Sequence, residues 1–243
     1  MWPNAGIRTM GAMITTEHPT PTTDHSDRRL VRAGGTAALV TAASYVVGFV
    51  ALGAFLIPAG YDPAEADPTE SLSFLLDHQA ALHAWYLVLY LVGGAAMAVV
   101  ALGVGQRLRS AEPALARVST TLGTIWSGLL LASGMIVLVG QQAVADLHAT
   151  DPDRAATVWS AVQVVADATG GGIELVGGLW ALVVGWAALR TGLLPRGLCR
   201  LGLVIGAAGV LTVVPGIAEP SAVLFGLGFI AWFIWAGLVL RRR

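Results

Sequence analysis

The stretch QVVADATGGGIELVGGLWALVVGWAAL, residues 163–189, decides the fold of this chain. Its second half is apolar for long enough to cross a bilayer as a helix, which takes about 20 residues. Two carboxylates, Asp167 and Glu174, precede or enter the apolar run, and Gly170-Gly171-Gly172 lies between them. A helix over 157–189 would be about 50 Å long, which exceeds the bilayer. We therefore expect a kink or break at the glycines; one long helix that projects from the membrane is the alternative.

The composition is that of a polytopic membrane protein. The 243 residues are 56% hydrophobic and 12% charged, whereas soluble domains carry about 25% charged residues. The 30 glycines fit the same class, because transmembrane helices tolerate glycine well. A net charge of −1 gives no field that would attract nucleic acid. The single Cys199 excludes an intramolecular disulfide and any multi-cysteine metal site.

Six apolar stretches predict an all-α bundle of six transmembrane helices. They lack the alternation of polar and apolar residues that barrel strands show. The polar residues 1–29 are expected to form a disordered cytoplasmic tail, in which Met10 and Met13 are alternative starts to Met1. Residues 30–243 form the predicted transmembrane domain. Its spans are predicted at about 33–57, 80–104, 119–143, 171–189, 198–217 and 221–240.

Arginine positions predict the orientation of the bundle. Cytoplasmic loops of membrane proteins carry an excess of Lys and Arg, and here every other connection is basic. The three opposite loops contain one cation, Arg154, and many carboxylates. We therefore expect both termini in the cytoplasm. The basic segments contain Arg28, Arg29 and Arg32; Arg107, Arg109 and Arg117; Arg190, Arg196 and Arg200; and Arg241, Arg242 and Arg243.

Polar residues at the outer ends of the predicted spans form the candidate site. A carboxylate at the centre of a span costs about 2.5–3.5 kcal/mol, so Glu174 is either a ligand for a proton, cation or substrate, or a hydrogen-bonded residue at the outer end. If the second, third and fourth spans are neighbours, these groups line an outward-facing polar cavity. Its candidate residues are Glu174, Asp167, His83, His78, Gln141 and Gln142.

A metal at this site is not predicted. Imidazole and carboxylate ligands suit zinc or iron, but His78 and His83 lie five residues apart, whereas neighbours on one helix face lie roughly three or four apart. Motifs for phosphate binding, zinc proteolysis and nucleophilic hydrolysis are absent from the sequence. No cofactor is therefore predicted.

The C-terminal third resembles a known family. Residues 180–200, WALVVGWAALRTGLLPRGLCR, continue into LGLVIGAAGVL, and the chain ends with FIAWFIWAGLVLRRR. The basic turn R-x-x-L-x-P-R-x-L spans Arg190 to Leu198. These features resemble small bacterial polytopic membrane proteins known only as a domain of unknown function. The resemblance implies a helical membrane architecture and no catalytic residues.

Three functions are compatible with these features. The leading hypothesis is a non-enzymatic protein of the bacterial plasma membrane, either an accessory subunit with an unknown membrane partner or a bundle that binds a small molecule or lipid. The alternative is a small proton- or cation-coupled transporter that uses Glu174. The third is a membrane enzyme with a metal at the outer face. A water-filled path past Glu174 would favour transport, and a dry, close-packed bundle would favour the first hypothesis.

Overall fold

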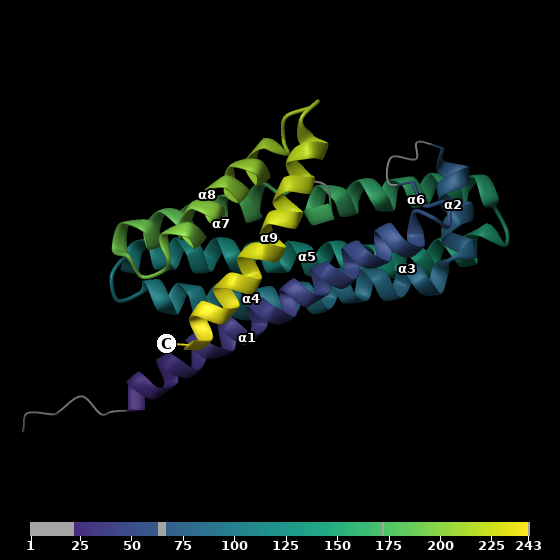
Figure 1. Cartoon of the computed structure of the whole chain (residues 1–243). Coiled ribbons are helices and arrows are strands. Elements are labelled where there is room, and N and C mark those ends of the chain that lie inside the picture. The colour runs from purple at the N-terminus through teal and green to yellow at the C-terminus, as the bar shows by residue number, and fades with distance from the viewer. Residues whose placement is uncertain (1–21, 63–66, 172, 243) are drawn as a thin grey trace, which may run out of the picture.

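The computed structural model describes residues 22–62, 67–171 and 173–242, and all regular structure in these ranges is helical (Figure 1). The elements are α1 (Thr22–Ala51), η1 (Leu52–Leu56), α2 (Pro68–Asp77), α3 (Gln79–Tyr86), η2 (Leu87–Val92), α4 (Gly93–Leu108), α5 (Pro113–His148), α6 (Pro152–Ala166), η3 (Asp167–Gly171), α7 (Leu175–Thr191), α8 (Arg196–Leu211) and α9 (Ala218–Arg242), where η marks a π-helical turn.

Six of these helices form a closed ring. Helix α1 packs between α4 and α9, α5 packs between α4 and α7, and α8 packs between α7 and α9. In the described ranges five helices are long and apolar enough to cross a membrane. Helix α8 has 16 residues, or about 24 Å of helix. The prediction of an all-α membrane bundle is thus confirmed, while the number of spans stays a prediction.

Apolar side chains cover the outside of the ring. On α5 the exposed Val118 and Val139 are separated by about 32 Å along the helix, close to the thickness of the hydrocarbon layer. Trp186 and Trp235 also face outward, with 53% and 40% of their surfaces exposed. This belt is the surface that a polytopic membrane protein presents to lipid.

Pairs of glycines let the helix backbones touch. A Cβ atom added at Gly34 would lie 2.8 Å from the Cα of Gly103, and one added at Gly178 would lie 2.8 Å from the carbonyl oxygen of Gly206. Such contacts matter because lipid tails leave little hydrophobic force to hold helices together. The pairs are Gly34 with Gly103 between α1 and α4, Gly35 with Gly237 between α1 and α9, and Gly178 with Gly206 between α7 and α8.

Aromatic side chains fill the centre of the ring. Trp126 of α5 and Trp180 of α7 pack with ring centroids 5.8 Å apart, and Trp180 meets Trp232 of α9 edge-on at 5.3 Å. Tilted and edge-to-face pairs add about 0.5–1.5 kcal/mol each beyond burial. The centre of the ring is therefore filled by aromatic side chains in direct contact. The cluster, called the aromatic centre below, consists of Trp126, Trp180, Phe225, Phe229, Trp232 and Phe233.

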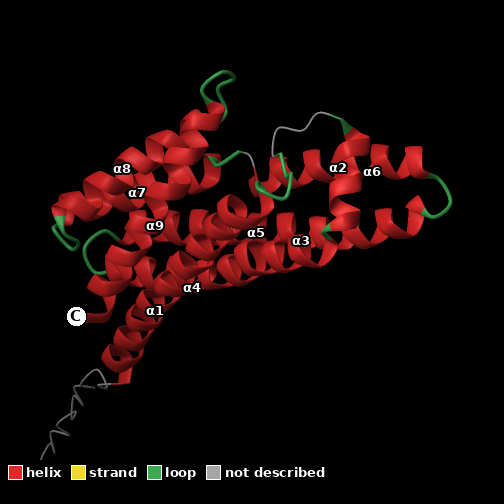
Figure 2. Ribbon diagram, turned by 45° about the vertical axis from the view of Figure 1, so that its right-hand side comes forward, coloured by secondary structure: helices red, strands yellow, loops and turns green. Residues whose placement is uncertain are grey.

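A small annex of α2 and α6 lies at the end of the bundle away from the C-terminus (Figure 2). Helix α6 packs on α5, and α2 packs on α6. The Trp159 indole donates to the Ser71 hydroxyl at 3.1 Å, and that hydroxyl donates to Gln163 at 3.2 Å. The sequence analysis did not predict α2. Its start signal is an Asp67-Pro68 pair, in which the Asp67 carboxylate accepts from the N–H of Thr69.

The predicted break at the glycines is present. Helix α6 passes into η3, and Gly170 has φ 153° and ψ 14°, a conformation that an L side chain rarely adopts. The next helix, α7, begins only at Leu175. The break therefore divides this segment into α6 and α7.

Several helices begin or end away from the bounds expected for the tail and the spans; α8, for example, ends at Leu211 rather than near residue 217. Helix α1 begins at Thr22, inside the tail expected to be disordered over 1–29, because extending an existing helix is far easier than starting one. Residues 1–21 lie outside the described residues. Helix α5 runs over Pro113–His148 rather than 119–143, so it projects from both ends of its apolar segment.

The arginine-rich segments meet at one end of the ring. The Arg190 guanidinium lies 3.7 Å from the Glu112 carboxylate, and Arg107 donates to the carbonyl of Leu193 at 3.5 Å. These contacts bring the α4–α5 connection beside the α7–α8 connection, at the same end as the C-terminus (Figure 1). The side of the membrane on which this end lies stays a prediction.

We expect Gly178→Ala to destabilise the bundle, because the new Cβ would lie 2.7 Å from the backbone nitrogen of Val210. The expected loss is about 1–3 kcal/mol in the free energy of unfolding. The control is Gly128→Ala on α5, where an added Cβ has no neighbour within 4 Å; it should leave stability equal or slightly higher, since alanine favours helix. Thermal unfolding in detergent measures both, and equal melting temperatures would contradict the packing role.

Candidate functional site

A cavity of about 220 Å³ lies beside the break in the α6–α7 segment. We call it the Glu174 pocket. Its walls come from α1, η2, α5 and α9, and its polar groups are the carboxylate of Glu174 and the phenols of Tyr45 and Tyr90. The other lining residues are Phe49, Leu89, Leu130, Gly170, Ala222, Val223, Phe225 and Gly226.

Two glycines set the walls of the pocket. Gly48 of α1 allows Leu89 to pack close, since a Cβ there would lie 2.8 Å from the Leu89 side chain, and Gly134 of α5 does the same for Tyr90 at 2.7 Å. Both Leu89 and Tyr90 belong to the π-helical η2. Such turns widen a helix locally and are frequent at functional sites. The π-helical turn η2 thus contributes the phenol of Tyr90 to the lining of the pocket.

Glu174 is held in place through its backbone. Its N–H donates to the Thr212 hydroxyl at 2.9 Å, and that hydroxyl donates to the carbonyl of Gly209 at 2.7 Å. Its carbonyl accepts from the N–H of Gly178 at 2.8 Å, which starts α7. Thr212 is buried at the end of α8. The break therefore does not leave Glu174 loose, because α7 and α8 fix it from two sides.

The carboxylate of Glu174 has an unsatisfied oxygen. Its Oε2 atom is buried and makes no hydrogen bond of good geometry within the described part of the chain, and the indole N–H of Trp126, which also lacks a well-formed hydrogen bond, is the donor that faces this carboxylate. Trp126 packs against Gly177, one turn further along α7, where an added Cβ would lie 2.6 Å from its ring. Burying a polar group without a partner costs about 1–3 kcal/mol. A donor placed in the Glu174 pocket would recover that energy.

The Glu174 pocket is closed toward the arginine-rich end and bordered by lipid-facing residues. Phe225 lines the pocket and belongs to the aromatic centre, which blocks the way along the ring axis. On the outside, Phe49 of α1 is 37% exposed and lies over Gly226 of α9, where an added Cβ would be 2.9 Å from its ring. The neighbouring Val223 is 49% exposed. Phe49 and Val223 therefore form the part of the pocket lining that reaches the outer surface of α1 and α9.

The six residues predicted for a polar cavity lie in different surroundings. Only Glu174 is among the described residues that line the pocket. Asp167 is exposed on η3, and His83 is exposed on α3. His78 lies between α2 and α3, where its ring stacks on Phe74 with centroids 4.3 Å apart and its Nδ1 lies 3.2 Å from the Phe74 carbonyl oxygen. None of these three side chains lines the Glu174 pocket.

The two glutamines of α5 also separate. Gln142 is exposed and donates to Asp146 at 3.1 Å. Gln141 is fully buried, and neither its amide nitrogen nor its oxygen has a partner among the described residues. In the same residues, no three His, Cys, Asp or Glu side chains come together as metal ligands would. Of the residues predicted to line one polar cavity, Glu174 lines the Glu174 pocket, whereas Gln141 is buried without lining that pocket.

Sequence reasoning missed Tyr45, Tyr90 and Thr212. Each is a hydroxyl-bearing residue in or at the end of an apolar segment. Their positions along the spans place them at a depth similar to that of Glu174, but the direction in which each side chain points depends on the neighbouring helices. That direction comes from the glycine contacts and is not readable from one segment alone.

Residues 35–239 match a family described as a domain of unknown function, DUF4386. The chain belongs to this family. The match runs from α1 to α9 and so covers the whole ring, rather than only the last third to which the resemblance in the sequence pointed. No curated protein and no solved structure matches the chain significantly. The family match therefore assigns no activity to this membrane protein.

Thr212→Val should destabilise the bundle, because it leaves the N–H of Glu174 without its acceptor. The expected loss is about 1–3 kcal/mol in the free energy of unfolding. Thr124→Val is the matched control, since this exposed hydroxyl bonds only the carbonyl of Thr120 in its own helix; its effect should stay within about 0.5 kcal/mol. Thermal unfolding of both variants checks the role of Thr212, and an unchanged Thr212→Val protein would refute it.

Proposed function

We propose that this DUF4386 protein is a non-enzymatic, multi-pass protein of the bacterial plasma membrane that binds a small amphipathic molecule in the Glu174 pocket. The observation that carries the proposal is the buried, unpartnered Oε2 of Glu174 beside a 220 Å³ cavity. An apolar cavity with a few polar groups is the usual form of a small-molecule site.

The lining of the pocket suggests the chemistry of the ligand. Leu89, Leu130 and Phe225 would surround an apolar body, while the Glu174 carboxylate would accept from one donor group. An amine supplies both a donor and a positive charge, and hydrogen bonds to charged groups contribute about 1.5–3 kcal/mol. An anion would be repelled by the carboxylate. We therefore propose a compact apolar amine as the ligand class.

The packing of the ring supports binding over transport. A carrier needs polar groups along a path between the two sides of the membrane. Below the Glu174 pocket the path would have to pass Trp180, Phe229 and Trp232, which are at most 1% exposed. The partly exposed Phe49 and Val223 in the pocket lining instead support entry of a ligand that is already dissolved in the bilayer.

The proposed orientation places the arginine-rich end in the cytoplasm and the annex outside. Cysteine introduced at Ala149, in the α5–α6 connection, should react with a membrane-impermeant maleimide on intact cells. Cysteine introduced at Ser110, in the α4–α5 connection, should react only after permeabilisation. Both positions are exposed, and the native Cys199 is buried, so its background labelling should be low. The reverse labelling pattern would overturn the orientation.

The ligand proposal predicts that hexylamine binds the purified protein and that Glu174→Gln weakens this binding. Loss of a charge-assisted hydrogen bond worth about 1.5–3 kcal/mol corresponds to a roughly 10- to 150-fold rise in Kd. Isothermal titration calorimetry in a neutral detergent measures the change. Hexanoate, which has the same chain length and the opposite charge, should not bind at this site.

Asp167→Asn is the matched control, because it removes the same charge from an exposed carboxylate that does not line the pocket. Its Kd for hexylamine should equal that of the wild type. If Glu174→Gln binds as tightly as the wild type, or if both variants weaken binding equally, the amine is held by general surface charge and the proposal fails.

A further inference from the structure

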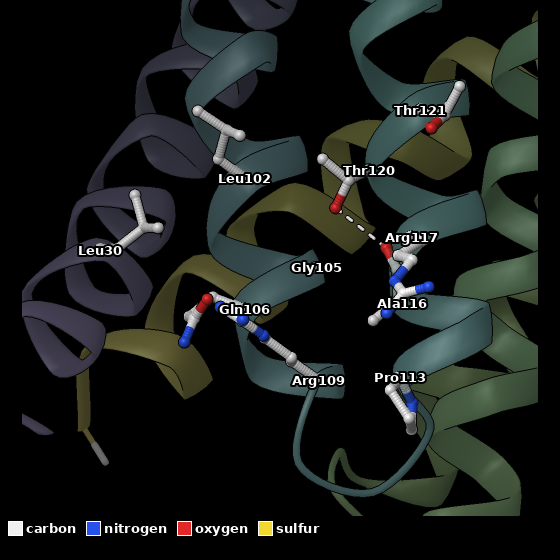
Figure 3. A pocket seen from close by; sticks show the side chains of 10 residues that line it. All are labelled: Leu30, Leu102, Gly105, Gln106, Arg109, Pro113, Ala116, Arg117, Thr120 and Thr121. Carbon is white, nitrogen blue, oxygen red and sulfur yellow. Dashed lines mark hydrogen bonds between the residues drawn. The ribbon is translucent and has the colours of Figure 1, made fainter. Parts of the chain in front are cut away.

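A second cavity, of about 410 Å³, lies at the arginine-rich end between α1, α4 and α5. Figure 3 shows Leu102, Gln106 and Arg109 on the α4 side and Arg117 and Thr120 on the α5 side, with Leu30 on the neighbouring α1. We call it the Arg109–Arg117 cavity. It is separate from the Glu174 pocket, with which it shares no lining residue.

Two positive charges line this cavity without a carboxylate to balance them. Arg109 and Arg117 make no ion pair with any residue that the structure describes, and no described Asp or Glu lines the cavity. The nearest acidic residue in the sequence, Glu112, lies 3.7 Å from Arg190. Orientation in the membrane requires arginines at this end, but it does not require two of them, from different helices, around one hollow.

The same cavity offers neutral polar groups and an apolar wall. The Thr120 hydroxyl donates to the carbonyl of Ala116 at 2.9 Å and keeps its acceptor capacity, and the half-buried Gln106 adds an amide. The absence of a side chain at Gly105 leaves space for the Thr120 hydroxyl, because a Cβ at this position would collide with it. Leu102 is 44% exposed and continues the lipid-facing belt. The cavity is therefore polar and cationic at one side and apolar where it meets the bilayer.

We infer that the Arg109–Arg117 cavity binds a phosphate group, with the headgroup of an anionic phospholipid as its main source. Guanidinium groups bind phosphate oxygens through paired, charge-assisted hydrogen bonds. The acyl chains of a lipid so bound would leave the cavity past Leu102 toward the hydrophobic belt. Basic pockets between helices on the cytoplasmic side suit anionic headgroups. Free inorganic phosphate presents the same chemistry without the chains.

The test compares phosphatidylglycerol with phosphatidylcholine of the same short chains, titrated into the purified full chain in neutral detergent. The wild type should bind phosphatidylglycerol at least 10-fold more tightly. Arg109→Gln/Arg117→Gln should lose this preference. Arg196→Gln/Arg200→Gln removes the same charge from exposed arginines of α8 at the same end, outside the cavity, and should keep it. Elution profile and melting temperature confirm that each variant is folded.

A third titration, with inorganic phosphate, separates the two sources. Binding of phosphatidylglycerol that millimolar phosphate does not displace identifies a lipid site, whereas displacement, or phosphate binding of equal strength, identifies a site for the free anion; both support a phosphate site. A wild type that binds neither overturns the inference. So does an equal loss in the two double variants, because general surface charge would then explain the binding.

Discussion

Backbone contact at glycine is the constraint on which this bundle depends. In lipid, helices gain little from burying apolar side chains against one another, so close van der Waals contact has to replace the hydrophobic effect. Gly34 against Gly103, Gly35 against Gly237 and Gly178 against Gly206 bring helix backbones into contact at three of the six ring interfaces. These interfaces are α1 with α4, α1 with α9, and α7 with α8. The small size of these glycines at the crossings leaves the volume at the centre for large aromatic side chains.

The break at Gly170 gives this architecture a site. A continuous helix would carry residue 174 past the ring as part of a single rod, with its backbone N–H bonded within the helix. The positive φ of Gly170 ends that rod, and the freed N–H of Glu174 is taken up by Thr212 of a neighbouring helix. A carboxylate that would otherwise be costly in the membrane is thus fixed beside a cavity. Local backbone geometry, rather than a sequence motif, creates the site.

The sequence alone predicted the features that depend on the lengths of apolar segments and on amino-acid composition. The helical class, the break at Gly170, the sorting of arginines to alternate connections and the membership in an uncharacterised family all follow from local patterns. The arrangement of side chains around the ring does not. Glu174, His83 and Gln141 were grouped by depth, yet His83 is exposed and Gln141 is buried away from the Glu174 pocket. The depth of a residue in the membrane follows from counting residues along a span. The direction in which its side chain points depends on which helices are in contact.

The annex shows the same limit at the level of whole elements. Helix α2 is short, and its polar start at Asp67 resembles a loop until its partner is known. Leu72 and Leu75 are buried only because α6 and the end of α5 provide a surface for them. A short helix whose apolar side chains are buried only by residues distant in the sequence is therefore difficult to predict from its own sequence.

The aromatic centre also has an electrical consequence. Trp126, Trp180 and Phe229 pack across the ring axis, between the Glu174 carboxylate at one end and the arginines at the other. Moving a bare charge through such a medium costs far more than the membrane potential supplies, about 2.3 kcal/mol per 100 mV. A bundle whose axis is filled in this way is built as a barrier to ions rather than as an open pore.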